Sequence, residues 1–276
     1  MDLQTNQAAH RLGFIGAGKL GGSVLRGLIR AKFCPRSEIM ASEPNAEVRV
    51  ALEDETGISM TTDNMEVATS SQIILVAVKP GVVLPAIREI ASVLKNKLVI
   101  SLAAGTRLAT MEKAAGARFM RAMTNTPSAI GRAATGLATG ARTTADDVAR
   151  ARNIFSAIGI VVEVREEDID VVTALAGSGP AFVYSVIEAL AKGATNSGLP
   201  DKVALALSTQ TVLGAAELAK NSEHSPEELR AMVVTPGGTT AAGLAKMQEY
   251  RVNEALAAAV EAATQRGREM AKEHEQ

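Results

Sequence analysis

A glycine-rich turn near the start of the chain has the residue types and spacing that bind a dinucleotide. The turn Gly16-Ala17-Gly18-Lys19-Leu20-Gly21 follows the apolar run Arg11 to Ile15 and opens an amphipathic segment. In this pattern the first glycine makes a tight turn, the second lets the backbone approach a pyrophosphate, and the third allows helix and strand to pack closely. The free N–H groups of the helix that follows favour phosphate. We expect a dinucleotide site here; an ordinary glycine-rich turn is the alternative.

An acidic residue follows the second predicted strand, where such a residue commonly holds the adenosine ribose hydroxyls. Glu43 lies about 20 residues after Gly21, the spacing of dinucleotide-binding folds. This favours NAD over NADP. The adjacent Ser42, and Arg49 on the next predicted helix, leave the opposite choice open, because Arg49 could reach a 2′-phosphate. A solvated surface glutamate is the third interpretation.

Two more predicted strands end in residues suited to a ligand site. Ala77-Val78-Lys79-Pro80 ends one buried strand in a cation and a helix-opening proline, and Ser101-Leu102-Ala103-Ala104-Gly105 ends the next in small residues. Ligands of open α/β sheets bind at the carboxyl edge, and small residues there leave room for a flat nicotinamide ring. Lys79 could equally be a solvated residue at a strand end.

Two Gly/Pro turns lie in the second half of the chain. We expect Gly177-Ser178-Gly179-Pro180 to open one helix and Thr235-Pro236-Gly237-Gly238-Thr239-Thr240 to open another. Backbone N–H groups of a Gly-Gly turn that leads into a helix form a nest suited to a carboxylate, and two hydroxyls follow directly. A plain N-cap is the structural alternative.

Other catalytic constellations are not supported by the sequence. His10, His224 and His274 are too scattered to predict a metal cluster or a Ser-His-Asp triad. Lys192 and Asn196 lie four residues apart on one predicted helix, a spacing that keeps a β-hydroxyacid-type dehydrogenase open as an alternative. A non-catalytic dinucleotide-binding sensor is the other alternative. Neither of these needs the turn at 236–240.

The first part of the chain has the pattern of βα units around a mostly parallel sheet. Continuous Val/Ile/Leu runs indicate strands that are covered on both faces. The predicted strands are Arg11 to Ile15, Glu38 to Ser42, Gln72 to Val78, Leu98 to Leu102, Arg118 to Met123 and Ile160 to Val164. The segment Arg132 to Gly140 is ambiguous: it follows Asn125-Thr126-Pro127 and could be an edge strand that is reached by a turn rather than by a helix.

After Val164 the strand signals stop and the rest of the chain is predicted to be helical. The helices from Phe182 and from Lys202 are apolar on nearly every face, which requires burial, and we infer burial against a second subunit. The predicted fold class is α/β: an N-terminal Rossmann-type doubly wound sheet (1–164) followed by an all-helical domain for dimerisation and substrate binding (165–276).

Composition bounds the class of protein and its partners. The chain has 276 residues, with 29 basic and 30 acidic side chains and a net charge of −1, which argues against nucleic acid and anionic membranes as partners. The single cysteine, Cys34, and the absence of a signal-peptide pattern indicate a cytoplasmic protein. The sequence contains no run of about eighteen uninterrupted apolar residues, so we predict no membrane-spanning helix.

The chain resembles pyrroline-5-carboxylate reductases in a series of motifs that occur in the same order from Arg11 to about Met270. The motifs are Gly13 to Gly18, Ala77 to Pro80, Ser101 to Gly105, Arg121 to Pro127, Asp170 to Pro180 and Pro236 to Thr240. The resemblance implies NADPH- or NADH-dependent reduction of Δ1-pyrroline-5-carboxylate to L-proline, the last step of proline biosynthesis. It also implies a homodimer, which in this family commonly assembles further into a decamer.

The resemblance assigns residues to both ligands. The residues implied to contact the cofactor are Ile15, Gly16, Ala17, Gly18, Lys19, Leu20, Gly21, Glu43, Asn64, Ala77, Val78, Lys79, Pro80, Leu102, Ala103 and Ala104. Those implied to line the substrate pocket are Glu223, Gly237, Gly238, Thr239 and Thr240. Ala176 and Val234-Thr235 depart from the family's usual serine and threonine residues, which puts the roles of those hydroxyls in doubt.

The expected mechanism depends on positioning rather than on a strong acid or a metal. The amides of Gly237 to Thr239 are expected to hold the substrate carboxylate while the nicotinamide delivers hydride to the imine carbon. The Thr240 hydroxyl or a bound water is expected to protonate or orient the imine nitrogen. Thr240 is therefore the predicted catalytic residue.

Overall fold

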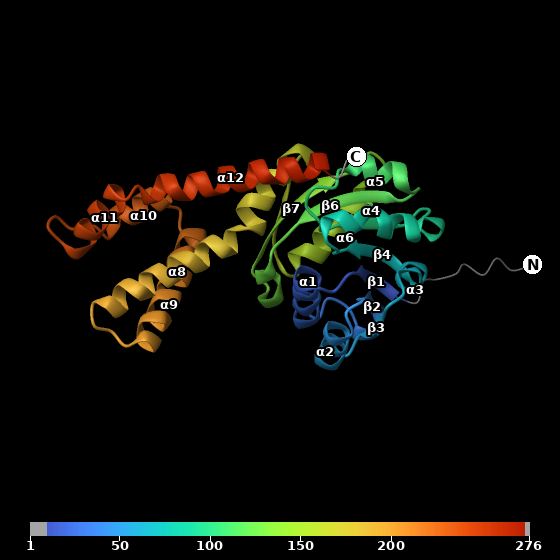
Figure 1. Ribbon diagram of the computed structural model, residues 1–276, viewed down its shortest axis with the longest axis horizontal. Coiled ribbons are helices and arrows are strands. Elements are labelled where there is room, and N and C mark those ends of the chain that lie inside the picture. The colour runs from blue at the N-terminus through green and yellow to red at the C-terminus, as the bar shows by residue number, and fades with distance from the viewer. Residues whose placement is uncertain (1–9, 274–276) are drawn as a thin grey trace, which may run out of the picture. The chain divides into compact units, whose positions relative to one another are not determined.

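The computed structural model describes residues 10–273, and the chain divides into two compact units (Figure 1). The first comprises Met1–Ser178 and Glu261–Gln276, and the second comprises Gly179–Val260. The end of the last helix thus belongs to the unit that contains the sheet. The domains predicted from sequence, 1–164 and 165–276, remain a prediction. The two compact units are defined by contacts within the structure, and such units need not have the same boundaries as domains.

The first unit is built on an eight-stranded sheet, which confirms the predicted Rossmann-type fold. Its strands are β1 (His10–Ile15), β2 (Ile39–Ser42), β3 (Ser59–Thr61), β4 (Ser71–Val76), β5 (Leu98–Ser101), β6 (Arg118–Met123), β7 (Ala133–Thr139) and β8 (Gly159–Glu163). The strand order is β3-β2-β1-β4-β5-β6-β7-β8, and every neighbouring pair is parallel except β6 and β7. The first six strands therefore have the order of a dinucleotide-binding fold.

Helices connect these strands, as expected for parallel neighbours. The helices of the first unit are α1 (Lys19–Arg30), α2 (Ala46–Thr56), α3 (Asn64–Ser70), α4 (Pro80–Glu89), α5 (Leu108–Ala114), α6 (Ala145–Ser156) and α7 (Ile169–Val172), joined by the last part of α12 (Val252–Glu273). Short 3-10 turns occupy Arg36–Glu38, Ala91–Val93, Thr126–Ile130 and Glu166–Asp168.

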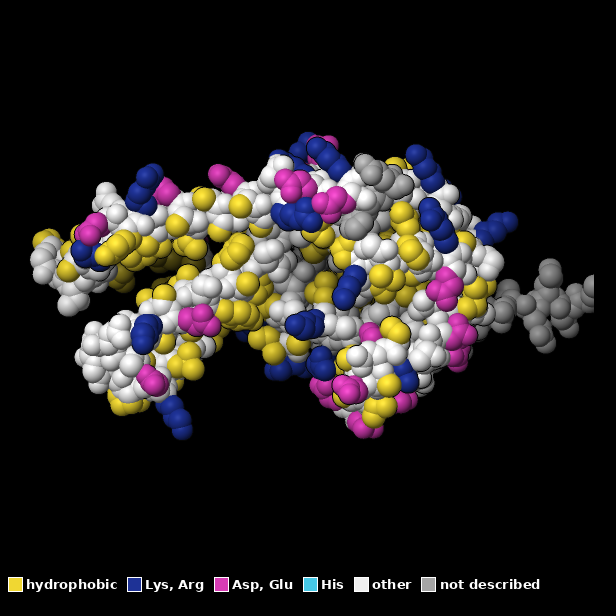
Figure 2. Space-filling model, in the orientation of Figure 1, with side chains coloured by type: hydrophobic (Ala, Val, Ile, Leu, Met, Phe, Trp, Pro, Cys, Tyr) yellow, Lys and Arg dark blue, Asp and Glu magenta, His cyan; other side chains and the backbone are white. Residues whose placement is uncertain are grey.

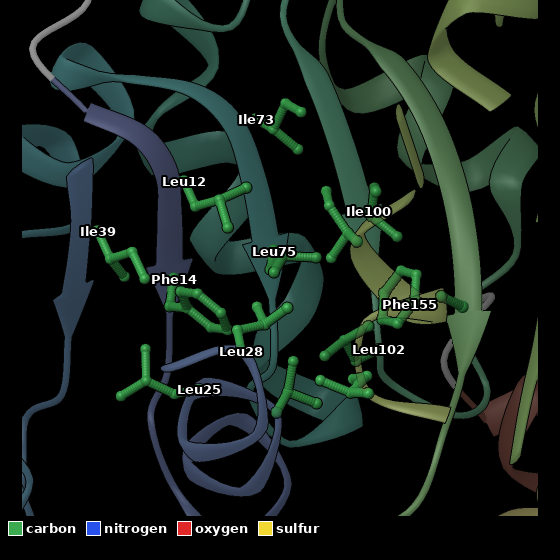
Figure 3. Packing of buried hydrophobic residues seen from close by; sticks show 14 of the residues in the cluster. Leu12, Phe14, Leu25, Leu28, Ile39, Ile73, Leu75, Ile100, Leu102 and Phe155 are labelled. Carbon is green, nitrogen blue, oxygen red and sulfur yellow. The ribbon is translucent and has the colours of Figure 1, made fainter. Parts of the chain in front are cut away.

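The core of the first unit lies on both faces of the sheet. On one face, Leu12, Phe14 and Leu75 of the central strands pack with Leu28 of α1 and Phe155 of α6 (Figure 3). The other face has its own cluster of buried side chains, contributed by β4, β5 and the helices α3, α4 and α5. Burial on both faces explains why the sequence of these strands shows continuous apolar runs.

Two strands differ from the prediction. The ambiguous segment Arg132 to Gly140 does contain a strand, β7, but this strand lies inside the sheet between β6 and β8 and not at its edge. The short strand β3 was not predicted, because Ser59-Met60-Thr61 is too short and too polar to give a strand signal. It forms the sheet edge beyond β2.

The second unit is entirely helical over Gly179–Val260. It contains α8 (Gly179–Asn196), α9 (Asp201–Asn221), α10 (Pro226–Met232), α11 (Thr239–Glu249) and the first part of α12. A capping box begins α10: the side chains of Ser225 and Glu228 each accept the other's backbone N–H.

Large apolar side chains of the second unit are exposed in the single chain. Leu190, Leu205, Leu207, Leu213 and Leu218 each expose 47–60% of their surface. Figure 2 shows hydrophobic side chains along these helices. A surface of this kind is typical of a subunit interface.

One helical stretch of the described residues is long and apolar enough to span a membrane by length and composition alone. It is Glu166–Asn196, with a window of mean hydropathy 1.3. The sequence criterion of uninterrupted apolar residues missed it. A single stretch of this kind is weak evidence for a membrane span, since apolar helices that meet a partner subunit have the same composition.

Candidate cofactor and substrate sites

The glycine-rich loop has the geometry that its sequence predicts. Gly16 has a φ of +87°, which disfavours any residue with a side chain. A Cβ on Gly21 would lie 2.5 Å from the Gly16 carbonyl oxygen, so Gly21 permits the helix to start close to the strand. A Cβ on Gly18, by contrast, would meet no atom within 4 Å. The first and third glycines are therefore needed for packing, and the second faces open space.

Helix α1 begins at this open space without a side-chain cap. Its N-cap is Gly18, which has no side chain to bond the amides of the first turn. The first N–H groups of a helix lack intrahelical acceptors, and the helix dipole adds positive potential there. A pyrophosphate fits this position, because its oxygens can accept from first-turn N–H groups to which the N-cap residue offers no side-chain acceptor.

Glu43 is buried, with 9% of its surface exposed, and both of its carboxylate oxygens accept backbone N–H groups. Oε2 accepts from Ala17 in the glycine loop at 3.1 Å, and Oε1 accepts from Asn45 at 3.0 Å. Arg49 donates from its guanidinium to the Glu43 carbonyl oxygen at 2.9 Å. The carboxylate thus braces the loop, and a half-buried arginine lies at the end of β2.

Asn64, at the start of α3, is tied to the same edge of the sheet. Ser42 Oγ donates to Asn64 Oδ1 at 2.7 Å, and Asn64 Nδ2 donates to Glu89 Oε2 at 2.8 Å. The sequence did not indicate these contacts. They place the Asn64 side chain beside the end of β2.

Apart from Asn64, which follows β3, the predicted cofactor residues lie at the ends of four strands that are neighbours in the sheet: β2, β1, β4 and β5. Because all four are parallel, their carboxyl ends lie at one edge. After β4, Lys79 is exposed and is the N-cap of α4, with Pro80 as the first helical residue. After β5, Ala103 is buried and Ala104 is half-buried. The fold brings these segments together as expected.

The segment after β8 covers part of this edge. Ile169 of α7 packs with Met123 and Ala138, and Ala104 and Val172 pack against that cluster. Arg107 donates to Asp170 at 2.9 Å, and Arg121 lies 3.4 Å from Glu166. Burial lowers the pKa of Arg121, and the nearby carboxylates of Glu166 and Asp170 oppose that shift. Apolar and ionic contacts together fix α7 at the edge.

Helix α8 begins at Gly179, so the segment Gly177 to Pro180 opens a helix as predicted, but the residues before it are helical as well. Thr173–Gly177 form a π-helical turn directly after α7, and Ser178 keeps a helical backbone with φ −86° and ψ −26°. The Ser178 N–H donates to the Thr173 carbonyl at 2.9 Å. The Ser178 N–H is therefore used within the helical turn.

The second Gly/Pro turn also opens a helix. Gly238 donates its N–H to the Thr235 carbonyl at 3.0 Å, which closes a β-turn, and Gly237 has a φ of +70°. Helix α11 then begins with Gly238 as an N-cap that has no side chain. The Gly238 N–H is therefore used by the turn, and the amides of Thr239 and Thr240 lie in the uncapped first turn of the helix.

Two further candidate residues lie apart from these turns in the sequence. Glu223 is exposed in the loop between α9 and α10, and Lys192 is exposed on α8. Among residues 10–273, no group of three His, Cys, Asp or Glu side chains could hold a metal ion. His274 lies outside the described residues.

The sheet order, the loop and the uncapped start of α1 are those of a Rossmann-type dinucleotide-binding protein. A family model described as pyrroline-5-carboxylate reductase dimerisation matches residues 166–270, and one described as NADP oxidoreductase, coenzyme F420-dependent, matches residues 11–105. These two matches account for both parts of the chain.

Complete relatives agree with the domain matches. A pyrroline-5-carboxylate reductase of Methanosarcina acetivorans is 41% identical and covers 95% of this chain and 98% of its own. One of Pisum sativum is 39% identical, covering 95% and 96%. The crystal structure of a Plasmodium falciparum pyrroline carboxylate reductase with NADP bound superposes with a TM-score of 0.88 at 29% identity, covering 96% of this chain and 100% of that one.

The chain belongs to the pyrroline-5-carboxylate reductase family. It is an NAD(P)H-dependent oxidoreductase with a dimerisation region, and hence a homo-oligomer that acts on a small molecule. The exposed apolar surface of α8 and α9 falls within this region.

Proposed function

We propose that the protein reduces Δ1-pyrroline-5-carboxylate to L-proline with NADPH or NADH, the last step of proline biosynthesis. One observation carries the proposal: two helices of the chain, α1 and α11, each begin with a glycine N-cap that leaves the first-turn amides uncapped. The reaction needs two anion sites, one for the cofactor's pyrophosphate and one for the substrate's carboxylate. The family membership supports this assignment.

In this proposal the first unit holds the cofactor. The loop from Ile15 to Gly21 binds the pyrophosphate, and Glu43 and Asn64 shape the adenosine end. The segments 77–80 and 102–104 receive the nicotinamide end. The bound cofactor supplies a hydride for the imine carbon of the substrate.

We further propose that NADPH is the preferred cofactor. Both oxygens of Glu43 accept backbone N–H groups, which leaves the carboxylate less available to ribose hydroxyls. Arg49 is held at the end of β2 by the Glu43 carbonyl, where a cation favours a 2′-phosphate. The bound NADP of the Plasmodium falciparum relative supports the same choice.

The substrate is proposed to bind at the start of α11. The first-turn amides of Thr239 and Thr240, with the backbone of Gly237, hold the carboxylate, while Gly238 contributes by closing the turn. Glu223 lines the same pocket. The hydride adds to the imine carbon, and a proton from the Thr240 hydroxyl or a bound water neutralises the nitrogen.

The assembly and location are also proposals. The dimer is expected to be the basic unit and to assemble into a decamer in the cytoplasm, without nucleic acid or membrane partners. The exposed apolar surface of α8 and α9 and the net charge of −1 support this view.

An assay of nicotinamide absorbance tests the proposal. We expect NADPH to be oxidised in the presence of pyrroline-5-carboxylate. With 3-hydroxyacids and NADP+ we expect no formation of NADPH. Turnover of 3-hydroxyacids instead would indicate a β-hydroxyacid-type dehydrogenase, and no turnover of either substrate would indicate a sensor.

Thr240 has its own test. Thr240→Ala should lower kcat by about 100-fold, the range of general acid catalysis, whereas Thr240→Ser keeps the hydroxyl and should retain most activity. Unchanged turnover of Thr240→Ala would remove this residue from the mechanism.

A further inference from the structure

The carbonyl of Ala176 lacks its ordinary helical donor because of the residue four positions later. In an α-helix this oxygen would accept from the N–H of residue 180, but that residue is proline and has no N–H. A proline ring also clashes with the carbonyl four residues before it. The π-helical turn at Thr173–Gly177 is the local consequence, and it leaves the Ala176 oxygen in need of another donor.

Asn125, at the end of β6, supplies that donor. Its Nδ2 donates to the Ala176 oxygen at 3.1 Å, and its Oδ1 accepts from the Ala134 N–H at 3.2 Å. The side chain exposes only 8% of its surface, so water is a poor substitute for either partner. Asn125 therefore links the π-helical turn to the start of β7 through one amide group.

This turn lies where the nicotinamide end of the cofactor is proposed to bind. A Cβ on Gly177 would approach the sulfur of Met123 at 3.5 Å, and Met123 packs in the cluster that includes Ala104. Ala104 ends the strand segment assigned to the nicotinamide. The π-helical turn thus stands beside that segment, at the carboxyl edge of β5 and β6.

We propose that Asn125 is a positioning residue for hydride transfer. Through the Ala176 carbonyl it sets the π-helical turn as one wall of the nicotinamide pocket. The proposal rests on the proposed function only for the site of the nicotinamide. Asn125 touches the wall and not the reacting atoms, so its loss should disturb alignment more than binding.

Two substitutions of Asn125 and one control test this role. Asn125→Ala removes both bonds. Asn125→Asp keeps the shape but sets an ionised oxygen against the Ala176 oxygen, and protonation at low pH restores a donor. Thr135→Val is the matched control: it removes the buried bond from Thr135 Oγ1 to Thr124 Oγ1, 2.9 Å long, at the same strand ends without touching the turn.

Hydrogen exchange of the cofactor-free protein is the first readout. We expect Asn125→Ala to speed exchange in a peptide covering residues 169–178, and Thr135→Val to leave that peptide unchanged. Equal exchange in wild type and Asn125→Ala, or an equal increase in the control, would overturn the proposal. This readout requires neither cofactor nor substrate, so it is independent of the proposed function.

Kinetics are the second readout. For Asn125→Ala we expect kcat to fall by about 10–100-fold, the effect of a misplacement of about 1 Å, while KM for NADPH changes less than about 3-fold. Asn125→Asp should regain activity relative to wild type as the pH is lowered, and Asn125→Ala should not. If both variants simply track the control in kcat at every pH, Asn125 is structural only. If wild type itself does not reduce pyrroline-5-carboxylate, the proposed function fails, and the exchange result still decides whether Asn125 holds the π-helical turn in place.

Discussion

The role of Glu43 gives a quantitative prediction about cofactor binding. The substitution Glu43→Gln keeps the size of the side chain but replaces one acceptor oxygen by an NH2 group. In Glu43 each carboxylate oxygen accepts one backbone N–H, from Ala17 or from Asn45. In the variant one of these two N–H groups must face the new NH2 group, which is itself a donor. Loss of one hydrogen bond to a charged group destabilises by about 1.5–3 kcal/mol.

The magnitude has two measurable consequences. At about 2 kcal/mol the Tm should fall by roughly 4–8 °C for a domain of this size. Since the loop is proposed to bind the pyrophosphate that both cofactors share, KM for NADPH and for NADH should rise by a similar factor. The ratio of the two kcat/KM values should stay within about 3-fold of wild type, because less than 1 kcal/mol of the loss distinguishes the cofactors.

The assay compares initial rates with both cofactors for wild type, Glu43→Gln and Glu47→Gln. Glu47 is an exposed acidic residue in the first turn of α2, so its substitution makes the same change of charge without touching the loop. If Glu43 instead holds the ribose hydroxyls, Glu43→Gln weakens NADH alone and shifts the ratio by more than 10-fold. That result would refute the bracing role.

Three further predictions concern specificity, packing and pH. Arg49→Ala should raise KM for NADPH by about 10-fold and leave KM for NADH unchanged, since the proposed charge-assisted bond to the 2′-phosphate would be lost; steady-state kinetics with both cofactors check this. Gly21→Ala should abolish cofactor binding or folding, because its Cβ would lie 2.5 Å from a backbone oxygen, and NADPH titration with circular dichroism separates the two outcomes. Burial alone would raise the pKa of Asp147, but bonds from Arg118 and Thr144 lower it overall. Its stabilising effect is therefore present above the unfolded pKa of about 3.9 and is lost as the pH falls through the lower folded pKa, so the Tm difference between wild type and Asp147→Asn should shrink below about pH 4.

Local signals predicted the parallel sheet and the loops at its edge. The strands β4 and β5 carry the aliphatic runs Ile-Ile-Leu-Val and Leu-Val-Ile, and the first and third glycines of the loop do tasks that a side chain would obstruct. The weak points were elements whose structure depends on their neighbours. The strand β3 has only three residues, and β7 lies in the interior because β8 pairs beside it, which no local pattern reveals.

The site was predicted less completely than the fold. The position of Glu43 after its strand was readable, but its bond to Ala17 joins residues 26 positions apart and depends on the path of the loop. The same holds for the link from Asn125 to Ala176, 51 positions apart. Sequence indicates which groups lack a local partner, and only the fold shows where the partner comes from.

Prolines show most clearly the difference between what the sequence indicates and what only the fold shows, because a proline removes a backbone N–H donor at a known position. Pro80 begins a helix, where its missing N–H would have had no acceptor, so the sequence alone explains it. Pro236 precedes a glycine with positive φ in a closed β-turn, which the sequence also indicates. Pro180 leaves the Ala176 carbonyl without a helical donor, a deficit that is readable from sequence, whereas its remedy, the amide of Asn125, is not. A proline that cannot be explained by a local turn therefore marks a carbonyl whose donor must come from elsewhere in the fold, and such a donor is a good place to look for residues that position a site.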